Sequence, residues 1–248
     1  MSDIGKRLGL LREMRRKHLL QLRTNCSVPE KDQNGSASNS LVGTLRFIAV
    51  ASYVLDKDVP AFRAGLAEAG GFSKQLFDRF GSGEPISPSY VSMMAFKELF
   101  NALASGDEGL SKAFAAQMGG RDAIEREYDR PFDVALGYVL KSILTTDDVA
   151  AMRYLQAFEL ACQERENSDF RGYAVVLRAI LDQDIEAAEA GFREVIAGHQ
   201  RQSKSGGLFK DTEDELLSVW GIGLANLARM QGLMVGPSSP FIPMELLV

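Results

Sequence analysis

Residues 54–68 read VLDKDVPAFRAGLAE and residues 180–194 read ILDQDIEAAEAGFRE. Aligned with each other, the two stretches share Leu, Asp, Asp, Ala, Ala, Gly and Glu at the same relative positions. In each, the pattern predicts that an apolar helix ends, an acidic turn follows, and a second aspartate, Asp58 or Asp184, caps the next helix by accepting hydrogen bonds from its free amides. The alternative is chance similarity between two alanine-rich helices. We interpret the pair as an internal repeat of a helix hairpin, which predicts an all-α fold.

The shared alanine and glycine residues indicate close packing within each hairpin. Small side chains keep one face of a helix narrow, so that a neighbouring helix can approach. Weaker versions of the pattern occur at residues 104–107 and 144–148. The four predicted caps are separated by 49, 41 and 36 residues, at Asp58, Asp107, Asp148 and Asp184. Since a strict solenoid would keep one period, we expect stacked antiparallel helix hairpins of unequal length, an irregular tetratricopeptide-like helical array.

Apolar residues recur at helical spacing along most of the chain, and no window shows sustained β alternation. Helices are expected near residues 40–56, 59–81, 88–104, 108–118, 121–130, 132–145, 148–165, 169–182, 185–201 and 212–231. We expect one helical domain, 1–248, with an amphipathic basic helix at 1–25, a loop at 26–40, a helical body at 41–232 and a Pro-rich tail at 233–248 packed on the body. The apolar face of the first helix is predicted to carry Ile4, Leu8, Leu11, His18, Leu19 and Leu22.

The predicted helix at 212–231 is apolar on nearly every side. Thr212 is expected to cap it, with Glu215 completing a capping box. Trp220 is then expected to be largely buried. Because a glycine inside a helix costs roughly 1 kcal/mol relative to alanine, we expect Gly221 and Gly223 to make room for neighbours on both sides.

The residues that follow cannot continue this helix. Gly232 is placed to end it in the left-handed conformation. Three prolines then prevent a continuous helix in the tail. The apolar residues of the tail are expected to pack back onto the body, namely Phe241, Ile242, Leu246 and Leu247.

The charge of the chain is unevenly distributed. The net charge is −5, but residues 1–25 hold seven basic and two acidic side chains, which leaves 21 basic and 31 acidic residues, a balance of −10, from position 26 onward. Such a body repels nucleic acid and anionic membranes and suits a cationic protein partner. The basic first helix can contact nucleic acid or lipid, mediate self-association, or dock its basic side on the acidic body. We favour the docked arrangement, with no nucleic-acid or membrane partner.

The sequence predicts a cytoplasmic protein. Cys26 and Cys162 are too few and too far apart for a disulfide framework, as is normal in a reducing compartment. The longest apolar run near the amino terminus, residues 8–11, is interrupted by Gly9 and is soon followed by Arg12, which argues against a signal peptide. No stretch approaches 18 apolar residues, so no membrane span is expected.

Histidine and cysteine residues offer little chemistry. The chain has only two histidines, His18 and His199, and neither has ligand residues at metal-binding spacing. Both are predicted to be surface residues, with His199 in a basic loop. Cys26 is predicted to open the loop at 26–40, and Cys162 to be a small core residue rather than a nucleophile.

Carboxylates are numerous, but their positions suit helix caps and solvated faces. Asp147 and Asp148, and the acidic run at 211–215, lie at predicted helix starts, where negative charge is favourable. No nucleophile elbow, phosphate-binding loop or dinucleotide-binding motif occurs. We therefore predict no catalytic, cofactor-binding or metal-ligating residues, although a pair of carboxylates brought together in space stays open as an alternative.

The end of the chain resembles a known family. Residues 210–233, KDTEDELLSVWGIGLANLARMQGL, and residues 240–247, PFIPMELL, are similar to the ends of bacterial immunity proteins of the all-helical immunity protein 49 family. The close match covers about the last 40 residues. The resemblance implies a helix-hairpin body and an antitoxin role, the neutralisation of toxins of polymorphic or secretion-delivered systems. It implies no catalytic residue.

The leading hypothesis is an immunity protein that binds and neutralises one cognate toxin domain in the cytoplasm, a basic domain such as a nuclease. The first alternative is a helical scaffold or adaptor that binds a partner peptide in a groove. The second is an enzyme that works through carboxylates alone.

Overall fold

The computed structural model describes residues 3–248, and side chains from Gly5 onward, so Ile4 lies outside the described side chains. Within this part of the chain 76% of the residues are helical and no strand occurs, which confirms the all-α class. Short turns and 3-10 helices join eleven α-helices: α1 (Asp3–Cys26), α2 (Ser36–Asp56), α3 (Val59–Gly81), α4 (Phe96–Ser105), α5 (Glu108–Gln117), α6 (Asp122–Tyr128), α7 (Pro131–Leu144), α8 (Asp148–Ala161), α9 (Arg171–Asp182), α10 (Ile185–Gln202) and α11 (Val219–Met230).

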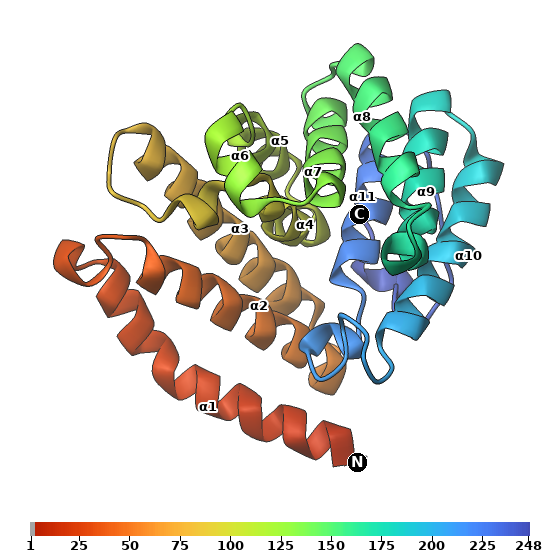
Figure 1. Ribbon diagram of the computed structural model, residues 1–248. Helices are drawn as coiled ribbons and strands as arrows, with labels where there is room; N and C mark the ends of the chain where they lie inside the picture. The colour runs from red at the N-terminus through yellow and green to blue at the C-terminus, as the bar shows by residue number, and fades with distance from the viewer. Residues whose placement is uncertain (1–2) are drawn as a thin grey trace.

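The helices follow one another across the molecule from α1 at one edge to α10 at the other (Figure 1). Short turns join three packed antiparallel pairs, α2–α3, α7–α8 and α9–α10. The last helix does not extend this series, because α11 returns to the middle of the molecule and packs against α4 and α9 (Figure 1). Packed helix pairs are therefore confirmed, whereas the likeness to tetratricopeptide arrays stays a prediction.

The two repeated stretches adopt the same local structure. α2 and α9 are followed by Lys57 and Gln183, whose backbone is left-handed, with φ of 57° and 56°. Asp58 Oδ1 and Asp184 Oδ1 then each accept a hydrogen bond from the amide three residues later, at 2.9 and 3.0 Å. The predicted repeat of a helix hairpin is confirmed.

One of the two weaker predicted caps is wrong. Asp107 Oδ1 accepts the amide hydrogen three residues later at 2.8 Å, as expected. Before α8, however, it is Asp147 that accepts such a bond, at 3.0 Å, while Asp148 is the first residue of the helix. Thr146, with φ of 57°, takes the left-handed position after α7, and this moves the cap one residue earlier.

Gly65 and Gly191, which are equivalent in the repeat, face the preceding helix of each hairpin. A methyl group added at Gly65 would lie 2.8 Å from Cβ of Ala49, and one at Gly191 would lie 2.8 Å from Cγ2 of Val176. Carbon atoms in contact normally lie about 3.5–4.0 Å apart. The two helices of each hairpin therefore approach closely because these positions lack a side chain, as predicted.

The segment predicted as a loop at 26–40 is shorter than expected, because helices occupy both of its ends. Cys26 still belongs to α1, a 3-10 turn spans Pro29–Lys31, and α2 already begins at Ser36. Composition suggested a longer loop because small and polar residues dominate this stretch.

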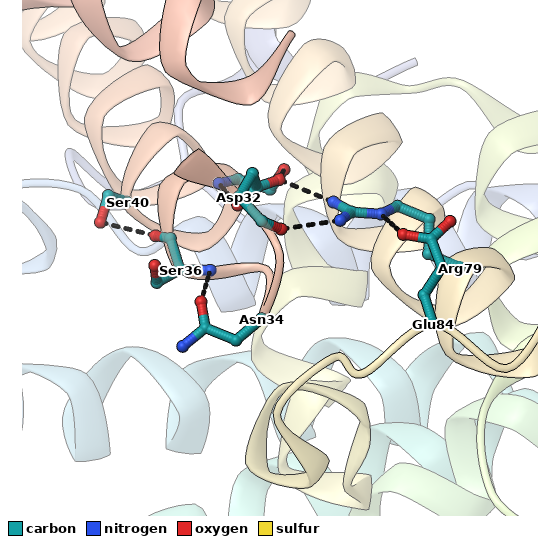
Figure 2. Close-up of polar contacts among 7 residues, drawn as sticks. Asp32, Asn34, Ser36, Ser40, Arg79 and Glu84 are labelled. Carbon is teal, nitrogen blue, oxygen red and sulfur yellow. Dashed lines mark hydrogen bonds and ion pairs between the residues drawn. The ribbon is translucent and has the colours of Figure 1, made fainter. Parts of the chain in front are cut away.

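Asp32 accounts for the early start of α2. Its buried carboxylate accepts hydrogen bonds from the amide of Ser38 at 2.9 Å and from the Ser38 hydroxyl, which fixes the first turn of α2. Arg79, at the end of α3, donates to the same carboxylate at 2.6 Å and to Glu84 at 2.7 Å (Figure 2). This network ties the connection between α1 and α2 to the end of α3.

Two further helix boundaries differ from the prediction. The helix expected at 88–104 is preceded by 3-10 turns at Pro88–Val91 and Met93–Ala95, so that α4 is shorter. A proline with no amide hydrogen favours such a start. The helix expected to reach residue 165 ends at Ala161.

The closing helix also starts later than predicted. Ser218 caps α11, because its Oγ accepts the amide hydrogen of Gly221 at 3.1 Å. Thr212 caps only the 3-10 turn Glu213–Glu215, so the predicted capping box is wrong. Arg46 on α2 forms ion pairs with the first two residues of this turn.

The other predictions for the closing helix are confirmed. Trp220 is 5% exposed, and Gly232 is left-handed with φ of +89°. A methyl group on Gly221 would lie 2.7 Å from Cδ1 of Ile242 in the tail, and one on Gly223 would lie 2.9 Å from an aromatic carbon of α4. The tail and α4 therefore pack closely against two sides of this helix, as predicted.

The Pro-rich tail packs on the body, as predicted. The hydroxyl of Tyr53 on α2 donates a hydrogen bond to Glu245, which joins the tail to an early helix of the chain. The apolar side chains of the tail lie in the core, with Phe241 partly buried beside the fully or nearly buried Ile242, Leu246 and Leu247.

α2 is more apolar than predicted from the sequence. Over Ser36–Asp56 an 18-residue window has a mean hydropathy of 1.2, so the helix is long and apolar enough to cross a membrane by length and composition. In the fold 61% of that window is buried, and α1 and α3 pack against the helix.

Candidate functional site

His199 is not a surface residue, and that prediction is wrong. It belongs to α10, is 3% exposed, and its ring stacks on Phe209 at 4.7 Å and contacts Phe241 at 4.9 Å. Neither ring nitrogen makes a hydrogen bond of good geometry among the described residues, although the backbone of Asp214 lies beside the ring. Burial lowers the pKa of His199 to about 4. His18, by contrast, is exposed on α1, as predicted.

The two cysteines lie on different parts of the array. Cys162 is 1% exposed at the end of α8, and burial raises the pKa of its thiol to about 12, which confirms a core role. Cys26 closes α1 rather than opening a loop, and burial also raises its pKa. In both cysteines burial therefore disfavours the thiolate form that nucleophilic cysteines need.

The predicted carboxylate runs are engaged in structural contacts. Asp147 caps α8, and Glu213 and Asp214 pair with Arg46. Glu215 pairs with Lys210 at 2.7 Å. Across residues 3–248 no group of three or more His, Cys, Asp or Glu side chains could hold a metal ion.

The basic α1 docks along α2, the arrangement favoured from the sequence. Leu8 is 6% exposed, and the guanidinium of Arg15 lies 4.3 Å from the centroid of the Phe47 ring. On its outer side α1 leaves Leu10 and Leu20 exposed. The ion pairs to the body join Arg12 to Asp56, Arg23 to Glu68 and Arg7 to Asp211.

An open groove of about 450 Å³ lies among α6, α7 and α8, and we call it the α6–α8 groove. Its floor is apolar. A floor of this kind with a few polar groups is typical of binding sites. The apolar lining comes from Pro131, Val134, Ala135, Tyr154 and Ala157, and the charged lining from Asp122, Glu125, Arg126 and Asp129. The lining thus includes three carboxylates and one guanidinium.

Hydrogen bonds hold one wall of the groove in place. Both oxygens of the Asp129 carboxylate are used, since they accept the amide hydrogens of Met93 at 2.8 Å and Met94 at 2.9 Å. The bonds anchor the 3-10 turn before α4 to the connection between α6 and α7. This wall is therefore formed before any partner binds.

A second set of contacts joins α6, α7 and α8 beside the groove. The Tyr138 hydroxyl donates to Glu125 at 2.9 Å, and its ring stacks on Tyr154 with centroids 4.4 Å apart and planes 11° apart. Burial, and then the neighbouring Glu125, raise the pKa of Tyr138 to about 12, so the hydroxyl stays a donor. Asp122 lies exposed at the rim.

Apolar side chains continue from the groove along the outer face of α8. Leu160 is 65% exposed and follows the lining residue Ala157 by three positions, which places both on the same side of the helix. Val149, at the start of α8, is 84% exposed, and Tyr128 on α6 is 37% exposed. None of these residues was predicted from the sequence. The two large apolar residues on the otherwise polar face of α8, Val149 and Leu160, could have indicated a binding surface.

No family model, curated protein or solved structure matches the chain. The resemblance of residues 210–247 to immunity protein 49 therefore stays a prediction.

Proposed function

We propose that this chain is an immunity protein that binds one cognate toxin domain in the cytoplasm and neutralises it by occupying its surface. The observation that carries the proposal is the α6–α8 groove, in which an apolar floor lies beside three carboxylates and one guanidinium. The partner is proposed to be a basic domain, such as a nuclease with a phosphate-binding cleft. The resemblance of residues 210–247 to immunity proteins supports the same function.

The chemistry of the groove suits a basic partner. Burying apolar surface contributes about 25 cal/mol per Å², and Ala157 and Leu160 offer such surface. Opposite charge raises the rate of encounter, and salt weakens this effect. Because hydrogen bonds already hold Asp129 and Glu125, little ordering of these walls is required on binding.

The experiment changes the floor of the groove in a folded protein. Ala157 is exposed on α8, so Ala157→Arg adds a long cationic side chain to the groove without disturbing the core. We expect this variant to lose co-purification with the toxin domain encoded beside its gene, and to lose protection of cells that express the toxin.

The matched control carries the same added charge elsewhere. Gln200 is exposed on α10, outside the groove, and Gln200→Arg is expected to bind and protect like the unaltered chain. Circular dichroism checks that both variants stay helical. Toxin binding by Ala157→Arg at unaltered affinity would show that the groove is not the binding surface.

A helical adaptor is the second candidate, because an open apolar groove also accepts an extended or helical peptide. The two functions differ in what the partner does. A bound peptide from a partner without toxicity, together with failure to protect against any neighbouring toxin, would favour the adaptor.

A further inference from the structure

The first helix has two different sides. α1 is the outermost helix at its edge of the molecule and packs mainly along α2 (Figure 1). Its inner side contributes Leu8, Leu11, Leu19 and Leu22 to the apolar clusters that it shares with α2. Its outer side faces solvent, so a partner can reach it without disturbing the fold.

The outer side of α1 carries a stripe of residues that are all exposed. They follow one another at alternating intervals of four and three residues, an average of about 3.6 that keeps them on one face of a helix. Leu10 and Leu20, which are 71% and 76% exposed, are the two most exposed leucines in the described part of the chain. We call this stripe the α1 seam, and it consists of Lys6, Leu10, Glu13, Lys17, Leu20 and Thr24.

The α1 seam is complementary to itself when two copies run antiparallel. A two-fold axis at the level of residue 15 places Leu10 of one copy opposite Leu20 of the other, and Glu13 opposite Lys17. Two-fold symmetry makes each contact occur twice, which gives two leucine pairs and two ion pairs. The antiparallel direction also sets the dipoles of the two helices against each other, which is favourable.

The charges around the seam permit this approach. Lys17 makes no ion pair among the side chains that the structure describes, while Glu13 lies exposed and contacts Arg16 of its own helix at 3.2 Å. Two flanking cations are neutralised by the body, since Arg7 pairs with Asp211 at 3.6 Å and Arg23 with Glu68 at 2.7 Å. Repulsion between two basic helices is therefore reduced.

A second copy suits the seam better than an anionic membrane or nucleic acid. Glu13 lies in the middle of the seam, where it would repel phosphate groups, but it meets a lysine in the antiparallel pair. The exposed leucines likewise gain nothing from a phosphate backbone, whereas each buries apolar surface against the other.

We propose that the α1 seam is the contact surface of an antiparallel, two-fold dimer of this chain. The body lies on the inner side of α1, so the dimer keeps the two acidic bodies apart (Figure 1). The α6–α8 groove belongs to other helices and stays open. Because a single helix pair makes a small interface, the dimer is weak and depends on concentration. This inference does not depend on the proposed function.

Sedimentation equilibrium of the full chain, from micromolar to nearly millimolar concentration, tests the dimer. The average mass is expected to rise with concentration from that of one chain towards that of two, and no further, because a two-fold contact closes on itself. The mass of one chain at every concentration would overturn the proposal, and so would growth beyond two copies.

A charge exchange tests the pairing of Glu13 with Lys17. Glu13→Lys places like charges opposite each other and is expected to weaken the dimer about tenfold, or about 1.4 kcal/mol. The double variant Glu13→Lys/Lys17→Glu has the net charge of the unaltered chain and is expected to restore the dimer. A double variant as weak as Glu13→Lys, or a single variant without effect, would contradict the antiparallel pairing.

A second set of variants tests the leucine pairs. Leu10→Gln/Leu20→Gln is expected to weaken the dimer at least about tenfold, whereas Leu208→Gln, at an exposed leucine outside α1, is expected to have no effect. Circular dichroism checks that the variants stay helical. An unaltered dimer in the double leucine variant would place the contact on another face. Binding of phosphatidylcholine–phosphatidylserine vesicles by a chain that stays monomeric would make α1 a lipid-binding surface and overturn the proposal.

Discussion

Arg46 on α2 forms an ion pair with Asp214, a residue 168 positions later in the chain. The same guanidinium pairs with Glu213 and donates to Oδ1 of Asn101 at 3.0 Å. Burial opposes the charge of Arg46, but Asp214 and Glu213 outweigh it and raise its pKa. This cluster joins an early helix, α4 and the segment that leads into α11.

Removing Arg46 is therefore expected to be costly. Arg46→Met leaves two shielded carboxylates without a cation, and breaking a buried pair in this way destabilises proteins by about 3–5 kcal/mol. Urea unfolding followed by circular dichroism measures the change. Arg16→Met, which removes an exposed pair with Glu13 on the same helix, is expected to cost less than about 1 kcal/mol. Similar losses in both variants would show that the Arg46 cluster adds no stability.

Trp220 is expected to be one of the most sensitive positions. Its ring lies 5.2 Å from Phe96 and 5.6 Å from Phe100, measured between centroids, and its side chain is 5% exposed. Trp220→Ala should cost on the order of 3–5 kcal/mol, the range for truncating a large buried aromatic. The fluorescence of this single tryptophan should be blue-shifted in the native protein. Emission typical of full exposure to water would contradict the packing.

Stability is expected to fall in mild acid because of His199. Its pKa is lowered to about 4 in the folded protein, against an ordinary value of 6.5. The unfolded chain thus binds more protons between these values, so folded stability is complete above pH 6.5 and decreases as the pH falls toward 4. The loss attributable to this group is up to about 3 kcal/mol, since one pKa unit corresponds to about 1.4 kcal/mol.

The control for this pH dependence is the exposed histidine. His199→Phe keeps an aromatic ring beside Phe209 and should flatten the stability profile between pH 4 and 6.5, whereas His18→Gln should leave it unchanged. An equally steep profile in His199→Phe would assign the acid sensitivity to carboxylates instead.

Replacing a glycine by alanine is expected to destabilise the fold inside the repeat and to stabilise it at an exposed position of α2. Gly191→Ala places a methyl group 2.8 Å from Val176 and should destabilise the fold by about 1–3 kcal/mol. Gly43→Ala, on the exposed side of α2 with nothing within 4 Å, should stabilise it by roughly 0.5–1 kcal/mol. Thermal unfolding of both variants measures the difference. Equal effects would mean that the α9–α10 contact can widen freely.

Local chemistry made the helix hairpins predictable. Asp58 and Asp184 act within three residues of their own positions, so the sequence around them contains all the information needed. His199 also had a usable signal. It continues the buried stripe of Ala188, Phe192 and Val195 at helical spacing, and the basic residues after it obscured this pattern.

Long-range contacts explain the predictions that failed. The start of α2 depends on Asp32, which is held by Arg79, 47 residues away. The 3-10 turn that precedes α11 forms ion pairs with Arg46, which lies on the distant helix α2. The α6–α8 groove could not be predicted either, because it requires Asp122, Val134 and Ala157 from three helices to meet in space. The spacing of residues along one helix does not indicate which residues of other helices lie beside them.

The central claim is that this chain neutralises a toxin by occupying it, and a stoichiometric titration tests that claim most directly. A fixed amount of the toxin domain encoded beside the gene is mixed with increasing amounts of this protein, and the remaining toxin activity is measured. We predict that activity falls linearly and is abolished near one equivalent of the protein, with no change over time. If far less than one equivalent inactivates all the toxin, and the inactivation progresses with time, the result would contradict occupancy and indicate an enzyme. Unaltered toxin activity at excess protein would contradict the immunity function itself.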